Sequence, residues 1–233
     1  MEKEYKNCYI AFLDMLGFKK MIESQKCSTI YEIFKKQLKK HIGKIYLGSE
    51  LCFDMSNIKM KVMSDSICFY VDCNITNALI GLIVTCQSFQ EQLLHLQDPI
   101  LTRGAIVRGN IFAENDIVFG PGFVKAYLME ENNAKYPRII MTKETIDSAK
   151  ENTADDVKRL LFECTLVDFD EFYVVDYWEL LNGLDTDNVF CPQLLSRINN
   201  ILETTLDISI REKYLYMKKQ LLRCYNPEEN SND

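Results

Sequence analysis

The order of its apolar segments most constrains what this chain can fold into. Residues 8–13 read CYIAFL, a short apolar run typical of a buried strand. Apolar residues at a three-to-four spacing then predict a long helix over residues 18–46, with a candidate break at Ser28, a plausible N-cap. Two strand-like runs, 58–63 and 67–71, flank Ser64-Asp65-Ser66 and predict a β-hairpin with a carboxylate at its tip.

The segments that follow continue the alternation of predicted strands and helices. A second apolar helix is expected over residues 75–96, ended by Asp98-Pro99 because the residue before a proline leaves helical space. Further strands are expected at 101–107, 110–112, 117–119 and 138–141, with helices at 123–132 and from Thr142 to 150. The order β-α-ββ-α-ββ-α-β predicts an α/β (α+β) fold, a ferredoxin-like, palm-type antiparallel sheet with helices on one face.

The chain of 233 residues is expected to form one main domain with an addition. Residues 1–150 hold the predicted palm-type sheet. Residues 151–233 are predicted to be a C-terminal extension packed on it, with a strand pair at 161–168 and 172–175 and a long helix at 193–223.

Composition excludes several classes of function. The formal net charge of -7 argues against a large nucleic-acid-binding surface. The N-terminal residues are not expected to form a signal peptide, and the longest apolar run, around residues 78–84, is too short to span a membrane. Nine cysteines without a CxxC pair and only two histidines favour reduced, buried thiols over disulfides or a zinc site. We therefore expect a cytoplasmic protein without nucleic-acid or membrane partners.

Two carboxylates stand out by position. Asp14 follows the first predicted strand and Asp65 lies at the hairpin tip, and these strands should be neighbours in one sheet. Convergent carboxylates suit Mg²⁺ or Mn²⁺, which bridge to substrate phosphates, and a turn at residues 15–17 would offer free N–H groups to a phosphate. The alternatives are a helix N-cap for Asp14 and a turn residue for Asp65.

Four motifs in order resemble those of the class III adenylyl and guanylyl cyclases over about residues 7–145. They are FLDMLGF (12–18), KVMSDSICFY (61–70), RGAIVRGNIF (103–112) and FGPGFVKAYLMEE (119–131). Their variant forms, together with FYVVDYW (172–178), look most like the bacterial pyrimidine cyclases of Pycsar antiphage defence.

This resemblance implies roles for individual residues. Asp14 and Asp65 match the two metal-binding aspartates, and Met15 is expected to be the third residue of the metal site. Lys61 falls on a base-selecting position, although a solvated strand lysine is the simpler interpretation. The backbone that matches the triphosphate-binding turn belongs to Met15, Leu16, Gly17 and Phe18.

The chain also departs from the purine cyclases. Gapless matching places Val124 and Leu128 where those enzymes have a transition-state Asn and Arg. Three interpretations remain: another cation replaces the transition-state Arg, the base of the substrate is not a purine, or the chain is inactive. The candidate cations are Lys125, Arg103 and Arg108, each of which is otherwise a surface charge, and Tyr127 is a candidate to stack on or exclude a base.

The resemblance implies a lyase that converts CTP or UTP to cyclic CMP or cyclic UMP and pyrophosphate. Two Mg²⁺ or Mn²⁺ ions would activate the 3′-hydroxyl and neutralise the triphosphate, in a site shared by a head-to-tail homodimer. A separate effector protein would read the product. One alternative is a catalytically degenerate, dimerising or nucleotide-sensing module. The other is a different palm-type phosphoryl transferase, although a GG[D/E]EF hairpin is absent from the sequence.

Overall fold

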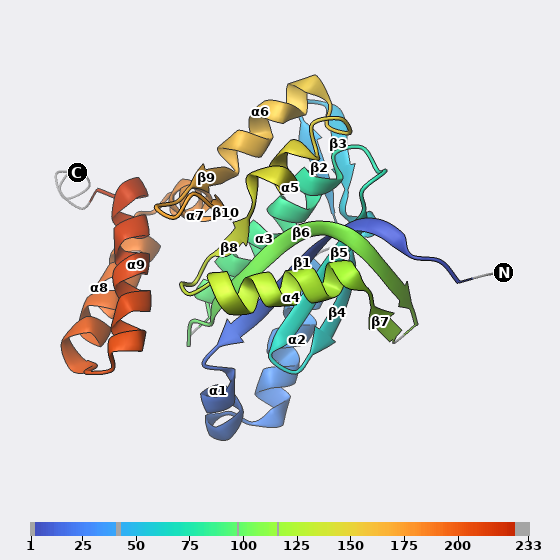
Figure 1. Cartoon of the computed structure of the whole chain (residues 1–233). Helices are drawn as coiled ribbons and strands as arrows, with labels where there is room; N and C mark the ends of the chain where they lie inside the picture. The colour runs from blue at the N-terminus through green and yellow to red at the C-terminus, as the bar shows by residue number, and fades with distance from the viewer. Residues whose placement is uncertain (1–2, 41–42, 97, 116, 227–233) are drawn as a thin grey trace.

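The computed structural model describes residues 3–40, 43–96, 98–115 and 117–226. One mixed sheet forms its centre, with strand order β4-β5-β1-β6-β8-β10-β9 and with β7 paired to β6 (Figure 1). Its strands are β1 (Lys6–Leu16), β4 (Lys59–Met63), β5 (Ser66–Asp72), β6 (Leu101–Glu114), β7 (Ile117–Phe119), β8 (Ile139–Met141), β9 (Thr165–Val167) and β10 (Tyr173–Val175). The sheet is antiparallel except where β8 runs parallel to β6.

The remaining elements surround this sheet. The helices are α1 (Phe18–Ser24), α2 (Cys27–Lys40), α3 (Ala78–Leu94), α4 (Pro121–Asn133), α5 (Lys143–Asp147), α6 (Asp155–Glu163), α7 (Trp178–Leu184), α8 (Phe190–Thr204) and α9 (Ile208–Cys224). A 3-10 turn, η1 (Met55–Asn57), follows a separate hairpin of β2 (Lys44–Leu47) and β3 (Glu50–Asp54). Within the described ranges, no helix combines the length and the apolar character that crossing a bilayer requires.

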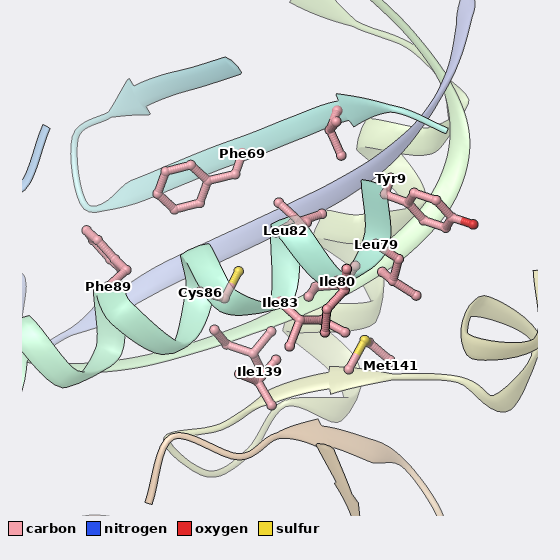
Figure 2. Packing of buried hydrophobic residues seen from close by; sticks show 14 of the residues in the cluster. Tyr9, Phe69, Leu79, Ile80, Leu82, Ile83, Cys86, Phe89, Ile139 and Met141 are labelled. Atoms are coloured by element: carbon pink, nitrogen blue, oxygen red, sulfur yellow. The ribbon is translucent and has the colours of Figure 1, made fainter. Parts of the chain in front are cut away.

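The main core lies between the sheet and α3. Alternate residues of β1 (Tyr9, Ala11, Leu13) point to this side because successive side chains of a strand face opposite ways. Figure 2 shows Cys86 and Phe89 of α3 close to Phe69 of β5. The Phe69 and Phe89 rings meet edge to face at 5.6 Å, a favoured aromatic geometry.

Helices cover both faces of the sheet, so the expectation of helices on one face only is wrong. The α4 helix crosses the sheet in Figure 1. The other residues of β1, among them Ile10 and Phe12, pack against Phe123 and Ala126 of this helix. The α4 helix approaches β6 so closely that a Cβ added at Gly109 would lie 2.6 Å from the Cα of Gly122. Glycines at this crossing therefore allow backbone to pack on backbone.

Other differences concern the ends of elements. The predicted helix at 18–46 is α1, α2 and then β2, and its residues 41–42 lie outside the described ranges. Residues 161–164 belong to α6 and to the residue after it, and the predicted helix at 193–223 is the pair α8 and α9. Asp207 starts α9 because its side chain accepts a hydrogen bond from the backbone N–H of Ile210 at 3.1 Å.

The C-terminal segment adds strands to the sheet as well as packing on it. β10 pairs with β8, and β9 pairs with β10, so the predicted boundary near residue 150 crosses a continuous sheet. A second apolar cluster joins α7, α8 and α9 to the ends of β1 and β6 through Leu16 and Leu101.

Candidate nucleotide and metal site

Asp14 lies inside β1 rather than at its end, since the strand continues to Leu16. It is paired with Ser66 of β5 on one side and with Arg103 of β6 on the other. Directly opposed residues of antiparallel strands point to the same face, so these side chains share the face that α4 covers. Asp14 is not a helix N-cap, because Gly17 takes that position before α1 with a left-handed φ of 80°.

Asp65 lies beside Asp14 through the β4–β5 hairpin, whose prediction is confirmed. Ser64 and Asp65 form its two-residue turn, and Ser64 has a φ of 58°. The backbone N–H of Met15 donates to the carbonyl oxygen of Asp65 at 2.9 Å. The structure therefore places Asp65, in the turn just before β5, next to the backbone of β1 at Asp14 and Met15.

Arg103 lies between two carboxylates. Its Nε donates to Asp14 Oδ2 at 3.1 Å and is 2.8 Å from Glu130 Oε1 of α4. Arg103 and Asp14 remain partly exposed, with side-chain exposures of 27% and 20%, whereas that of Glu130 is 4%. The guanidinium thus connects Asp14 to a buried carboxyl group.

Glu130 is a residue of the site that the sequence motifs did not indicate. Burial raises the pKa of its carboxyl group to about 7; the charge of Arg103 opposes this rise, and that of Asp14 adds to it. Glu130 follows the fully buried Ala126 by four residues, so the two share the inner face of α4. This spacing is the signal that would have placed Glu130 toward the sheet.

The backbone after Asp14 differs from the expected phosphate turn. The N–H of Met15 is already bonded to Asp65, so it is not free for a phosphate. Met15 and Phe18 are buried in the main core, and Leu16 packs on the second cluster. Of residues 15–18, only Gly17 is exposed.

Two predicted substrate-binding residues lie on the same face as Asp14. Lys61 is opposite Cys68, which is opposite Phe12, two residues before Asp14. The Lys61 ammonium donates to the backbone carbonyl oxygen of Asn115. The Tyr127 ring meets the Phe12 ring edge to face at 5.6 Å and is 40% exposed.

The structure does not bring the other two candidate cations to Asp14. Lys125 Nζ is 4.0 Å from Glu144 Oε2 and is half exposed. Arg108 is opposite Tyr9, so its side chain lies on the α3 face of the sheet. There, its Nε donates to Asn7 Oδ1 at 3.1 Å.

The positions aligned with the purine-cyclase Asn and Arg are exposed and apolar. Val124 is 52% exposed and Leu128 is 46% exposed. With Tyr127 they follow a three-to-four spacing along the outer face of α4. We call this set of three residues the α4 stripe.

The donor set at Asp14 and Asp65 fits a hard divalent cation. Within the described ranges, the Asp65 carboxylate has no hydrogen bond or ion pair, and Asp14 is bonded only through Oδ2. No cluster of three or more His, Cys, Asp or Glu side chains in this part of the chain could hold a metal. Mg²⁺ commonly takes one or two carboxylates and completes its shell with water and substrate phosphates, so two aspartates are sufficient.

No family model and no curated protein matches the chain. Among solved structures, it is similar to the monomeric guanylyl cyclase domain of the RhoGC fusion protein from the aquatic fungus Blastocladiella emersonii. That likeness has 13% identity and a TM-score of 0.50, and it covers 74% of this chain and 96% of that chain.

Two other similar structures are bacterial. The adenylate/guanylate cyclase/hydrolase from Silicibacter pomeroyi has 15% identity and a TM-score of 0.46, with coverage of 74% of this chain and 95% of that one. The adenylyl cyclase CyaB from P. aeruginosa has 15% identity and a TM-score of 0.43, with coverage of 65% and 84%. From the likeness to the fungal domain we conclude that the chain has the fold of the class III adenylyl and guanylyl cyclase domains.

Proposed function

We propose that this protein is a nucleotide cyclase, which converts a nucleoside triphosphate to a 3′,5′-cyclic nucleotide and pyrophosphate. The observation that carries this proposal is the adjacency of Asp14 in β1 to Asp65 in the β4–β5 turn, with Arg103 bonded to Asp14. Carboxylates for a metal and a cation for phosphates are what phosphoryl transfer requires, since the chemistry depends mainly on positioning and charge stabilisation.

Asp14 and Asp65 would hold Mg²⁺ or Mn²⁺, which when bound supplies positive charge to the phosphates and lowers the pKa of a coordinated hydroxyl group. Arg103 lies on the β6 side of Asp14, whereas Asp65 lies on the β5 side. From there Arg103 would contact a phosphate oxygen. Its bond to Asp14 and its proximity to Glu130 limit the positions that its guanidinium can take. The residue therefore binds and orients the substrate without moving far.

We further propose a pyrimidine substrate, CTP or UTP, on the basis of the sequence resemblance. The exposed, apolar Val124 and Leu128 support this proposal, because neither side chain can make the polar contacts of the Asn and Arg that purine cyclases have there. Tyr127, next to Phe12, is the aromatic residue that we propose to limit the size of the base. In this proposal the cyclic nucleotide is a second messenger of antiphage defence and is read by a separate effector.

A head-to-tail homodimer is part of the same proposal. The α4 stripe is an exposed apolar surface on the face of the sheet that carries Asp14. A second copy that covers it would bring its own residues to the Asp14 site and would exclude water from the reaction.

Separate incubations with each of the four ribonucleoside triphosphates and Mn²⁺, analysed by mass spectrometry, test the substrate. We expect cyclic CMP or cyclic UMP with an equal amount of pyrophosphate. Cyclic AMP or cyclic GMP as the main product would refute the pyrimidine assignment and leave the cyclase in place.

The alternative is a degenerate cyclase fold that binds nucleotides without converting them. The apolar Val124 and Leu128 favour it, since they stand where catalytic polar groups are expected. Calorimetry with each triphosphate separates the two functions. Tight binding by a protein that forms no cyclic product would establish the binding module.

A further inference from the structure

A small pocket lies next to Arg103, where α9 approaches the core. It has a volume of about 120 Å³ and is lined by Arg103, by Lys135 and Tyr136 from the segment after α4, and by Ser209, Glu212 and Lys213 from the first turns of α9. We call it the α9 pocket. Pockets for drug-sized molecules measure roughly 300–1,000 Å³, so this one suits a single small group.

The charges of the α9 pocket are mostly positive. Three of its six lining residues are cationic and one is anionic. Glu212 already forms an ion pair with Lys135, since its Oε2 lies 2.8 Å from Lys135 Nζ. Arg103 is shared with Asp14 and Glu130.

Lys213 is the cation whose charge is not balanced. Its side chain is half-buried, and within residues 3–40, 43–96, 98–115 and 117–226 it forms no hydrogen bond or ion pair. The unpaired ammonium group leaves the pocket with an excess of positive charge, which attracts an anion. An anion in the pocket would supply the missing partner.

The wall that presents Lys213 is firmly held. Arg138 is buried and bonds to Asp168 and Asp170, and the Tyr216 hydroxyl of α9 donates to Asp168 Oδ2 at 2.7 Å. The rings of Tyr136 and Tyr216 stack at 4.9 Å. Since Tyr136 itself lines the pocket, the same contacts that anchor α9 also fix the pocket's shape.

The pocket and Asp65 lie on opposite sides of Asp14. Asp65 is on the β5 side, whereas Arg103 and the pocket are on the β6 side. A phosphate chain held at the aspartates and directed toward Arg103 would end in the α9 pocket.

We propose that the α9 pocket binds the terminal phosphate of the substrate's triphosphate, with Lys213 as its main ligand and Lys135 and Ser209 beside it. This inference rests on the proposed function, since it assigns part of the same nucleotide site to the C-terminal segment. It makes Lys213 a substrate-binding residue about 200 positions away from Asp14 in the sequence.

Calorimetric titration with tripolyphosphate and Mg²⁺ tests the pocket without requiring turnover. Lys213→Gln should weaken binding about ten-fold, as the loss of a charge-assisted contact does, and Lys213→Arg should restore most of it. Lys219→Gln is the matched control, because Lys219 is exposed on the same helix and does not line the pocket. Thermal unfolding of each variant verifies that α9 is retained.

Comparing the affinities for triphosphates and for monophosphates shows which phosphate group the pocket binds. The Lys213→Gln variant should lose affinity for CTP, UTP and tripolyphosphate alike, and its affinity for CMP and UMP should be unchanged. Equal loss for the monophosphates would contradict a role at the terminal phosphate.

The inference is overturned if folded Lys213→Gln binds tripolyphosphate as the wild type does, or if the wild type does not bind it. Binding through Lys213 by a protein that makes no cyclic nucleotide would refute the cyclase and support the pocket. An active cyclase whose KM for triphosphate is unchanged by Lys213→Gln would refute the pocket alone.

Discussion

At the scale of single residues, Glu130 is a buried carboxyl group beside the candidate site, and its surroundings change its pKa. Its Oε1 lies close to Arg103 but forms no hydrogen bond among the described residues. Burial therefore raises its pKa to about 7 in spite of the nearby guanidinium. At neutral pH the group is divided between its neutral and charged forms.

The raised pKa of Glu130 predicts a pH-dependent stability. The folded chain binds this proton more tightly than the unfolded chain, in which the pKa is about 4.5. Between these two values the folded state holds more protons, so the free energy of unfolding should fall as pH rises from about 4.5 to 7, by on the order of 3 kcal/mol. Urea unfolding at a series of pH values measures this change in the free energy of unfolding.

The Glu130→Gln variant isolates this contribution. It should lack the fall in stability across that window, whereas Glu131→Gln, at the exposed neighbour, should keep it. If Glu130→Gln and the wild type lose the same free energy of unfolding between pH 5 and pH 8, the assignment to Glu130 is wrong.

At the scale of elements, the crossing of α4 over β6 positions Glu130 and the α4 stripe. A Cβ at Gly122 would lie 2.6 Å from Ile10 Cδ1 and 2.7 Å from the carbonyl carbon of Gly109. The second of these atoms belongs to the backbone and cannot move without shifting β6. The distance between helix and sheet therefore depends on these glycines.

Gly122→Ala should reduce the free energy of unfolding by about 1–3 kcal/mol or more, the usual cost of overpacking. Gly183→Ala in α7 is the control, because a Cβ there would have no atom within 4 Å. The control should be neutral or stabilising by up to about 1 kcal/mol. Denaturant titration of both variants gives the comparison, and equal stabilities would contradict the close crossing.

Local sequence patterns predicted some elements and missed others. The β4–β5 hairpin and α3 follow clear patterns, and the predicted order of strands brings Asp14 and Asp65 together. The β2–β3 hairpin was missed because Ile45 continues the apolar spacing of the preceding helix. Pairing between strands, rather than helical periodicity, decides that segment.

Parts of the site depend on contacts that one sequence does not reveal. The face on which Arg108 lies follows from the register of β6, which placed it opposite Tyr9 and away from Asp14. The burial of Glu130 depends on where α4 packs, and the α9 pocket depends on the contact between Tyr136 and Tyr216. The roles assigned to Asp14, Asp65 and Arg103 remain predictions.

At the scale of the whole molecule, the C-terminal segment and the core should unfold together. β10 pairs with β8 in the central sheet, and Tyr216 bonds to Asp168. Trp178, the only tryptophan, is buried in the C-terminal segment, so its fluorescence reports on that part. We expect its unfolding midpoint to coincide with that of far-ultraviolet circular dichroism.

Tyr216→Phe should lower both midpoints equally, since it removes a hydrogen bond to a charged group worth about 1–3 kcal/mol. A tryptophan transition at lower denaturant than the circular dichroism transition would show that the C-terminal segment unfolds separately. That result would also remove the fixed wall on which the α9 pocket depends.

The most direct test of the central claim is the amount of cyclic nucleotide formed by the wild type and by Asp65→Asn. Both are incubated with CTP, UTP and Mn²⁺ and analysed by mass spectrometry, with circular dichroism to show that the variant is folded. We expect a cyclic pyrimidine nucleotide from the wild type and at least about 100-fold less from the variant, because half of the proposed metal-binding pair is lost. No cyclic product from folded wild-type protein, or equal amounts from both, would contradict this expectation.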